Sequence, residues 1–349
     1  MLSRYFGLSP KLVELCYVNN TDSSNINVFG HVKARFSTNF GKNRILSNYR
    51  IISKKSTKHQ TLALTLVTIY VTLAIMNTIT ANKTIAHSIK AADVVSWLLS
   101  HGISAATTDE LAALLGLPKN HVRQRLVPLI KRFEMISPAR GLWIPVPYEY
   151  RLWGAPEAIY YIDQMMNYLK VEYYVGWLSA ADILGASHHA PQVFQVATSR
   201  AVENRDIGRS RLHFFERSNV GTLPVFQHKT QTGFVNVSTR AATMLSVTHD
   251  ISLASGSDNA ANIIIELSET EDDIISDIAS CASLFPITAL RRLGWILESF
   301  TDINNLEQLS EISRKSDVRL SKLSMYNSYS NKINYRWSLD INERIEPDV

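Results

Sequence analysis

Residues 107–132 read Thr107-Thr-Asp-Glu-Leu-Ala-Ala-Leu-Leu-Gly-Leu-Pro-Lys-Asn-His-Val-Arg-Gln-Arg-Leu-Val-Pro-Leu-Ile-Lys-Arg132. Thr107 and Glu110 have the spacing of a capping box, in which each side chain bonds to the backbone N–H of the other residue. Leucines follow at helical spacing, and Gly116 suits the left-handed residue that ends a helix. Pro118 favours the first turn of a new helix. The stretch therefore predicts a short helix, a tight turn and a second helix.

The second of these helices combines an apolar stripe with a donor-rich outer face. The apolar residues recur at helical spacing: Val122, Leu126, Leu129 and Ile130. From residue 119 to residue 140, six Lys or Arg are opposed only by Glu134, a balance of +5. Amide and cationic side chains bond to base edges and phosphates. We expect DNA contacts from Lys119, Asn120, His121, Arg123, Gln124, Arg125 and Arg140.

The flanking residues complete a winged helix-turn-helix. Residues 88–100 have apolar side chains at helical spacing, and His101-Gly102 ends that run. Residues 133–146 read as two short strands joined at 138–141, which predicts a wing with Arg140 near its tip. Pro128 predicts a kink or an early end of the second helix. The alternative is a three-helix module whose charged face is merely solvated.

Composition limits the class of protein. The chain has 349 residues, of which 46% are hydrophobic and 19% charged, as in ordinary globular proteins. Cys16 and Cys281 are too few for a disulfide framework or a cysteine-built zinc site, and they suit a cytoplasmic protein. The net charge is +5, but residues 1–60 hold ten Lys or Arg against Glu14 and Asp22, a balance of +8. The remainder sums to −3, so overall charge does not argue for DNA binding.

The N-terminal segment differs from the rest. Residues 1–84 are expected to be unstructured or an over-extended reading frame, with Met76 as the physiological start. The charge-free run 61–76 is 16 residues long, shorter than the roughly 18–20 residues of a spanning helix, so a membrane anchor is the less favoured alternative. A winged helix-turn-helix at 85–147 and a second domain at 148–349 follow.

The second domain mixes helical and strand patterns, so the expected fold class is α+β, a winged helix-turn-helix followed by a mixed α/β domain. Helices are expected at 158–169, 173–186, 241–245, 274–281 and 290–298, with Thr239 capping the third of them. Strands are expected at 193–196, 212–215, 225–226 and 234–237, and a closing strand at 335–342.

Four segments in this order carry a family resemblance. They are Tyr173-Tyr-Val-Gly-Trp-Leu-Ser-Ala-Ala-Asp-Ile-Leu-Gly185 with Gln192-Val-Phe-Gln-Val-Ala-Thr198, Arg291-Arg-Leu-Gly-Trp-Ile-Leu-Glu298, Tyr335-Arg-Trp-Ser-Leu-Asp-Ile-Asn342 and Glu346-Pro-Asp348. Over residues 85–349 the chain resembles the AbiEi family, the antitoxins of type IV toxin–antitoxin systems. The resemblance implies an N-terminal domain that represses its own operon at inverted repeats. It also implies a C-terminal domain that counteracts a nucleotidyltransferase toxin encoded beside it, without an obligatory stable complex.

The resemblance further implies a basic face on the antitoxin domain. The arginines available for it are Arg200, Arg205, Arg209, Arg211, Arg240, Arg291 and Arg292. Arginine pairs bidentately with phosphate or carboxylate, although Arg291 and Arg292 are equally compatible with a packed helix. The chain departs from the family at residues 238–245, where relatives often carry acidic residues. Self-association on operator DNA is compatible with this family.

No catalytic residue, metal site or cofactor is expected. Ser187-His188-His189 has no carboxylate or cysteine at ligand spacing, so it reads as a surface loop. Glu269, Glu271, Asp272 and Asp273 precede a helix, where acidic groups complement its dipole. No nucleotide-binding glycine motif is present in the sequence. Two further functions remain open: a winged-helix regulator with a ligand-sensing or dimerisation domain, and a nuclease-like enzyme that uses the acidic cluster.

Overall fold

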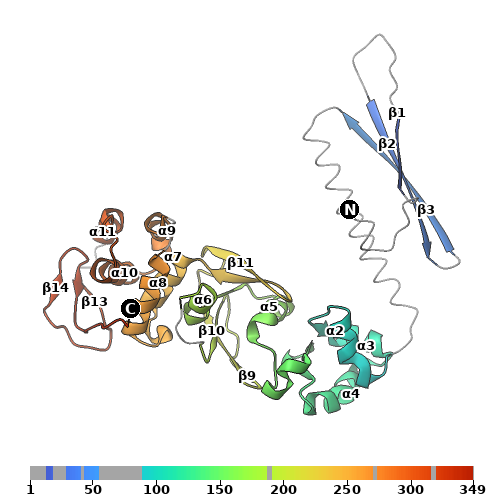
Figure 1. The fold of residues 1–349 in the computed structure, drawn as a ribbon, viewed down its shortest axis with the longest axis horizontal. Coiled ribbons are helices and arrows are strands. Elements are labelled where there is room, and N and C mark those ends of the chain that lie inside the picture. The colour runs from blue at the N-terminus through green and yellow to red at the C-terminus, as the bar shows by residue number, and fades with distance from the viewer. Residues whose placement is uncertain are drawn as a thin grey trace, which may run out of the picture. The chain divides into compact units, whose positions relative to one another are not determined.

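A computed structural model describes the backbone of residues 13–18, 29–40 and 43–54, and both backbone and side chains of residues 89–186, 191–269, 273–315 and 320–348. The chain divides into two compact units, residues 1–86 and 87–349, and the fold is mixed α+β (Figure 1). The apolar run 61–76, Met76, Ser187-His188-His189, Glu271 and Asp272 lie outside the described residues. Within the described part of the chain, no helix is long and apolar enough to cross a membrane.

The first unit contains a three-stranded antiparallel sheet, which the sequence analysis did not expect. Strands β1 (Val13–Val18), β2 (Phe29–Phe40) and β3 (Asn43–Lys54) pair in chain order. The β2–β3 pairing runs from Phe29 opposite Lys54 to Phe40 opposite Asn43. Apolar residues alternate with basic residues along 32–36. This period-two pattern is typical of a strand and was missed among the turn-forming residues.

The second unit begins with a helix–hairpin module, residues 89–146. Its helices and strands are η4 (Ala91–Asp93), α2 (Val94–Ser100), β4 (Ala106–Thr107), α3 (Thr108–Leu115), α4 (Lys119–Lys131), β5 (Met135–Ala139) and β6 (Leu142–Pro145). The capping box of Thr107 and Glu110 is confirmed, and Gly116 has a left-handed conformation with φ 63°. Helix α4 continues through Pro128, so the helix does not end early there.

The sheet of this module, in the order β4-β6-β5, is apolar on both faces. Met135 and Trp143 lie in the core that the sheet shares with α2, α3 and α4. Ile136 and Ile144 lie in a second core, together with the helix α5 (Ile162–Leu169) of the following segment. A cut at the expected boundary between residues 147 and 148 would therefore expose apolar side chains on both fragments.

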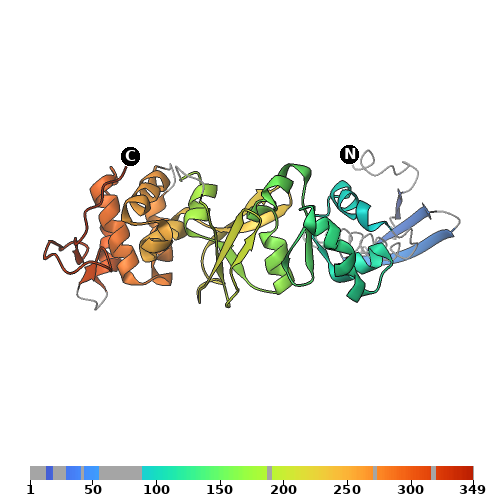
Figure 2. The same ribbon diagram turned by 90° about the horizontal axis from the view of Figure 1, so that it is seen from below.

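A six-stranded mixed sheet follows, in the order β11-β12-β7-β8-β10-β9. Figure 2 shows its green to yellow strands between the helix–hairpin module and the orange and red C-terminal helices. Its strands are β7 (Tyr173–Val175), β8 (Phe194–Thr198), β9 (Arg205–Ile207), β10 (Ser210–Glu216), β11 (Val225–Thr230) and β12 (Gly233–Ser238). The four strands expected here are confirmed. The helix expected over 173–186 is wrong at its start, because residues 173–175 pair with β8 and only α6 (Trp177–Ile183) is helical. The 3-10 helices η5 (Tyr148–Trp153) and η6 (Ala158–Tyr160) precede α5.

Helices form most of the remainder: α7 (Arg240–His249), η7 (Ile251–Ala254), α8 (Ser257–Ser268), α9 (Ile274–Cys281), η8 (Ala282–Leu284), α10 (Ile287–Phe300) and α11 (Glu307–Arg314). Thr239 caps α7 as expected, by accepting a hydrogen bond from the Ala242 N–H. The short strands β13 (Ser321–Lys322), β14 (Ile333–Asn334) and β15 (Leu339–Asp340) close the chain. The closing strand expected over 335–342 covers only Leu339 and Asp340. Residues 335–338 form a turn instead, in which Trp337 packs on α10.

Trp337 is fully buried and packs directly on Gly294 of α10. We predict that Gly294→Ala destabilises the protein by about 1–3 kcal/mol, since a Cβ at this position would overlap the indole ring and overpack the core. Thermal unfolding measures the effect. The exposed Ser299→Ala on the same helix is the control, because it gains helix propensity without a clash. Equal or greater stability of Gly294→Ala would contradict this packing.

Candidate nucleic-acid interface and arginine cluster

The side chains on the outer face of α4 are exposed. Val122, Leu126 and Leu129 are buried against the rest of the helix–hairpin module and fix the rotation of the helix. All seven side chains expected to contact DNA are exposed: Lys119, Asn120, His121, Arg123, Gln124, Arg125 and Arg140. The structure thus places them on α4 and on the hairpin tip, at positions open to a ligand.

Two cations of this region already have protein partners. Lys119 Nζ lies 2.7 Å from Asp109 Oδ2, in an exposed ion pair. Arg132 Nε lies 3.1 Å from Glu134 Oε1, and this hydrogen bond lowers the pKa of Glu134 and raises that of Arg132. Their charges are therefore largely compensated within the protein.

Four other cations of the same region have no ion-pair partner within the described residues: Arg123, Arg125, Lys131 and Arg140. Exposed cations without counter-charges give a local positive potential, although the chain beyond residue 60 carries a net negative charge. This potential favours a polyanion over a neutral partner.

The hairpin tip is held from two sides. The Thr108 N–H donates to the Gly141 carbonyl at 2.8 Å, and the Tyr168 hydroxyl donates to the Arg140 carbonyl at 3.0 Å. Gly141 has φ +91°, and a Cβ there would lie 2.5 Å from the Tyr168 hydroxyl oxygen. Only glycine fits this position, and the Arg140 side chain is presented from a fixed backbone.

Arg291 and Arg292 are not part of an exposed face, which corrects that expectation. They are 1% and 2% exposed. Arg291 bonds to Ser321 Oγ and to the Ser313 carbonyl, and Arg292 bonds to the carbonyls of Lys322 and Thr248. Burial lowers the pKa of both guanidinium groups. These arginines connect α10 to neighbouring segments, and helical periodicity could not distinguish that role from a surface role.

The other arginines lie at different positions. Arg205 Nε donates to the Pro138 carbonyl at 3.2 Å, so this side chain joins β9 to the hairpin. Exposed Arg200 donates to the Leu169 carbonyl at 2.7 Å. Arg240 is half-buried at the start of α7. Arg209 and Arg211 are both exposed, Arg209 at the turn between β9 and β10 and Arg211 in β10.

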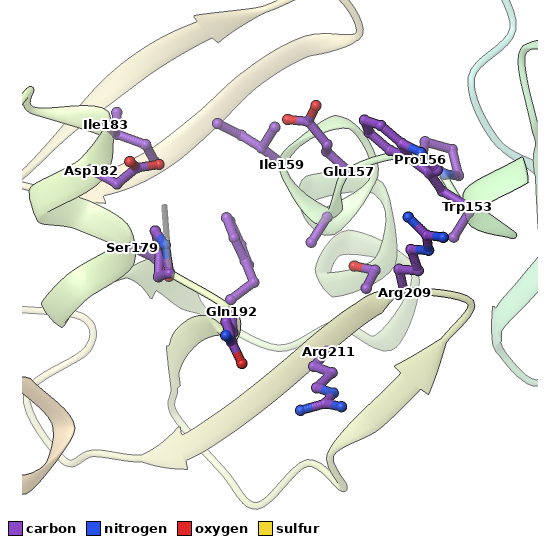
Figure 3. A pocket seen from close by; sticks show the side chains of 15 residues that line it. Trp153, Pro156, Glu157, Ile159, Ser179, Asp182, Ile183, Gln192, Arg209 and Arg211 are labelled. Carbon is purple, nitrogen blue, oxygen red and sulfur yellow. The ribbon is translucent and has the colours of Figure 1, made fainter. Parts of the chain in front are cut away.

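Arg209 and Arg211 line a cavity of about 290 Å³ beside α6. Figure 3 shows Arg209 near Trp153 and Pro156, whereas Asp182 lies across the cavity on α6. Burial raises the pKa of Asp182. The lining thus combines cationic arginines and an anionic aspartate with the apolar side chains of Ile159 and Ile183. This composition suits a polar ligand with an apolar part.

The described lining of the cavity shows no serine–histidine or cysteine–histidine arrangement of the kind that activates a nucleophile. No histidine, cysteine or lysine is among its described lining residues. Of its two serines, Ser179 bonds to the backbone of Gln195 and Val193, and Ser210 accepts from the Tyr161 hydroxyl. Across the described residues, no group of three His, Cys, Asp or Glu is arranged to hold a metal ion. Asp273 accepts from the Ser276 N–H at the start of α9, which agrees with the capping interpretation of that acidic run.

Four residues for which the sequence predicted no role form a polar hub: Trp177, Gln195, Arg217 and Asp250. The Gln195 amide accepts from the Leu178 N–H at 2.8 Å and donates to the Leu253 carbonyl at 2.9 Å. Trp177 Nε1 donates to Asp250 Oδ2 at 3.1 Å, and the Arg217 guanidinium lies 2.8 Å from the same oxygen. The sequence signal for this hub was a polar residue, Gln195, within an otherwise apolar strand. The hub joins the sheet to the helical part.

The part of the chain that contains the polar hub matches a known protein family. The family model described as the AbiEi antitoxin C-terminal domain matches residues 174–299. The solved structure of the RV2827C protein from Mycobacterium tuberculosis is similar in fold, with a TM-score of 0.52 and 15% identity over 71% of this chain and 90% of that chain. No curated protein matches the chain. Residues 174–299 belong to the AbiEi antitoxin C-terminal domain family.

Proposed function

We propose that this protein is an antitoxin that represses its own operon through the helix–hairpin module, which acts as a winged helix-turn-helix. In this proposal it counteracts a neighbouring nucleotidyltransferase toxin, in the manner of a type IV system, through the domain at 174–299. The observation that carries the DNA-binding part is the group of four exposed cations without counter-charges on α4 and the hairpin tip. An antitoxin domain implies a toxin that it counteracts.

The order of side chains on α4 suits the major groove. Asn120, Gln124 and Lys131 lie opposite the buried stripe, on the outermost line of the helix. Amide side chains bond bidentately to adenine, whereas arginines at the flanks reach phosphates. Arg123 and Arg125 flank this line on its two sides. The fixed hairpin tip would bring Arg140 to the adjacent backbone.

The antitoxin activity is assigned to the exposed arginines of the second half. Arg209 and Arg211 keep their guanidinium groups available, and Arg200 lies at the surface of the same sheet. A guanidinium group binds carboxylate or phosphate bidentately, so these side chains suit an acidic surface of the toxin or a phosphate of its substrate. Arg205 contributes by holding the hairpin and is not a candidate for the contact.

The cavity beside α6 favours a second candidate, a regulator whose C-terminal domain senses a small ligand. The gene that follows discriminates between the two. A nucleotidyltransferase-fold protein encoded there supports the antitoxin assignment, whereas its absence supports the regulator.

We predict that Arg123→Ala and Arg125→Ala each weaken binding to the DNA upstream of the gene. A lost phosphate contact reduces the slope of log K against log salt concentration by about 0.9, and a lost base contact costs roughly 1–3 kcal/mol. Electrophoretic shift or fluorescence anisotropy across a salt series measures both quantities. Growth rescue from the toxin is expected to remain.

Arg132→Ala is the matched control, since Arg132 is exposed at the end of the same helix but paired with Glu134. Its affinity and salt slope are expected to stay close to those of the unmodified chain. Unchanged binding in both Arg123→Ala and Arg125→Ala would remove α4 from the DNA interface. Substitutions are used in the full chain because the hairpin shares its core with α5.

We predict that the double substitution Arg209→Ala/Arg211→Ala reduces growth rescue from the toxin and leaves DNA affinity and thermal stability unchanged. Both side chains are exposed, so their truncation removes a contact without removing core packing. A growth assay with the neighbouring gene under inducible control measures rescue. Arg314→Ala, an exposed arginine of α11, serves as the control. Full rescue by the double variant would show that these arginines are not the antitoxin contact.

A further inference from the structure

Residues 324–335, called the loop below, lie between β13 and β15 and include the two-residue strand β14. The largest side chains of this loop are exposed. Tyr326, Tyr329 and Tyr335 are 80%, 56% and 84% exposed, and Met325 is 64% exposed. Figure 1 shows β13 and β14 at the C-terminal end of the second unit, beyond α10. Three tyrosines and a methionine of this short loop are thus exposed to solvent, and burial in the monomer does not explain these large side chains.

The backbone of this loop is nevertheless held by buried and half-buried polar side chains. The Asn342 amide donates to the carbonyls of Ser324, Asn327 and Ser328, at 2.9, 3.0 and 3.2 Å. Fully buried Asp340 accepts from the Ser330 N–H at 2.8 Å and from its hydroxyl at 3.0 Å. The loop is therefore preorganised, with its polar groups bonded inward and its aromatic rings directed to solvent.

Lys332 is the one charged side chain of residues 324–335. Lys322 and Arg336 flank this loop, and the carboxylate of Asp340 is buried against Ser330. Lys322 Nζ bonds to the Asn327 carbonyl and lies 5.3 Å from the centroid of the Tyr329 ring. Arg336 is paired with Glu298 and Glu307. Lys332 is exposed and has no ion pair with any described residue.

We infer that residues 324–335 bind single-stranded nucleic acid, with bases stacked on Tyr326, Tyr329 and Tyr335 and a phosphate near Lys332. Stacking platforms combine exposed aromatic rings with a few cations and tolerate any base. The rings here alternate with Ser and Asn and do not form the continuous apolar centre of a typical protein interface. The inference is independent of the DNA-binding role of α4.

Fluorescence anisotropy of a labelled 12-nucleotide oligouridylate tests the inference on the full chain carrying Arg123→Ala and Arg125→Ala. This background lacks two of the four uncompensated cations of α4 and the hairpin tip. Because every loop variant is compared in the same background, the remaining contribution of α4 is constant, and failure of either proposal is seen separately. Tyr326→Ala and Tyr335→Ala are each expected to weaken binding at least about fivefold. Tyr326→Phe keeps most of the affinity because the ring remains. Lys332→Ala reduces the salt slope by about 0.7, the value for one phosphate contact on a single strand.

Tyr148→Ala is the control, since Tyr148 is 81% exposed but lies outside the loop. Absence of oligouridylate binding by the parent chain, or equal losses in Tyr148→Ala and Tyr326→Ala, would overturn the inference. Unchanged oligouridylate binding together with lost growth rescue in the alanine variants would also overturn it, since the loop would then serve a protein partner.

Discussion

The two-sided sheet of the helix–hairpin module is the constraint on which the rest of the structure depends. Trp143 faces the core of α2, α3 and α4, whereas its neighbours Leu142 and Ile144 face the core around α5. Side chains alternate across a strand, so a run that is apolar at every position must be covered on both faces. The hairpin therefore belongs to two cores at once. On this module, the outer face of α4 and the tip at Arg140 remain exposed.

This arrangement leaves separate exposed surfaces on the helix–hairpin module and on the segment that follows it, although the two share a core. The hairpin tip is bonded to Thr108 on one side and to Tyr168 on α5 on the other. Arg205 adds a bond from β9 to the hairpin. In the proposed DNA complex, helix α4, whose rotation is fixed by Val122, Leu126 and Leu129, and the hairpin tip held by these bonds would need little ordering, which favours affinity. In the AbiEi domain, the hub residues Trp177 and Gln195 lie on α6 and β8. The exposed Arg209 and Arg211 lie at the β9–β10 turn and on β10.

Much of the helix–hairpin module could be predicted, because its signals are local. The capping box at Thr107, the turn at Gly116 and the apolar stripe of α4 all appear in the structure as expected. Long-range contacts could not be predicted in this way. Arg291 and Arg292 have the same helical spacing as surface arginines, and only the segments packed on α10 show that they are buried. The two cores of the hairpin were readable in the continuous apolar run of β6, which was interpreted only as a wing strand.

The central claim is that α4 and the hairpin tip contact DNA while the AbiEi domain does not. Hydrogen–deuterium exchange of the full chain, with and without the DNA upstream of its gene, tests this most directly. The account predicts slower exchange in residues 119–131 and around Arg140, with residues 174–299 unchanged. Slower exchange in residues 174–299, with α4 unaffected, would contradict it.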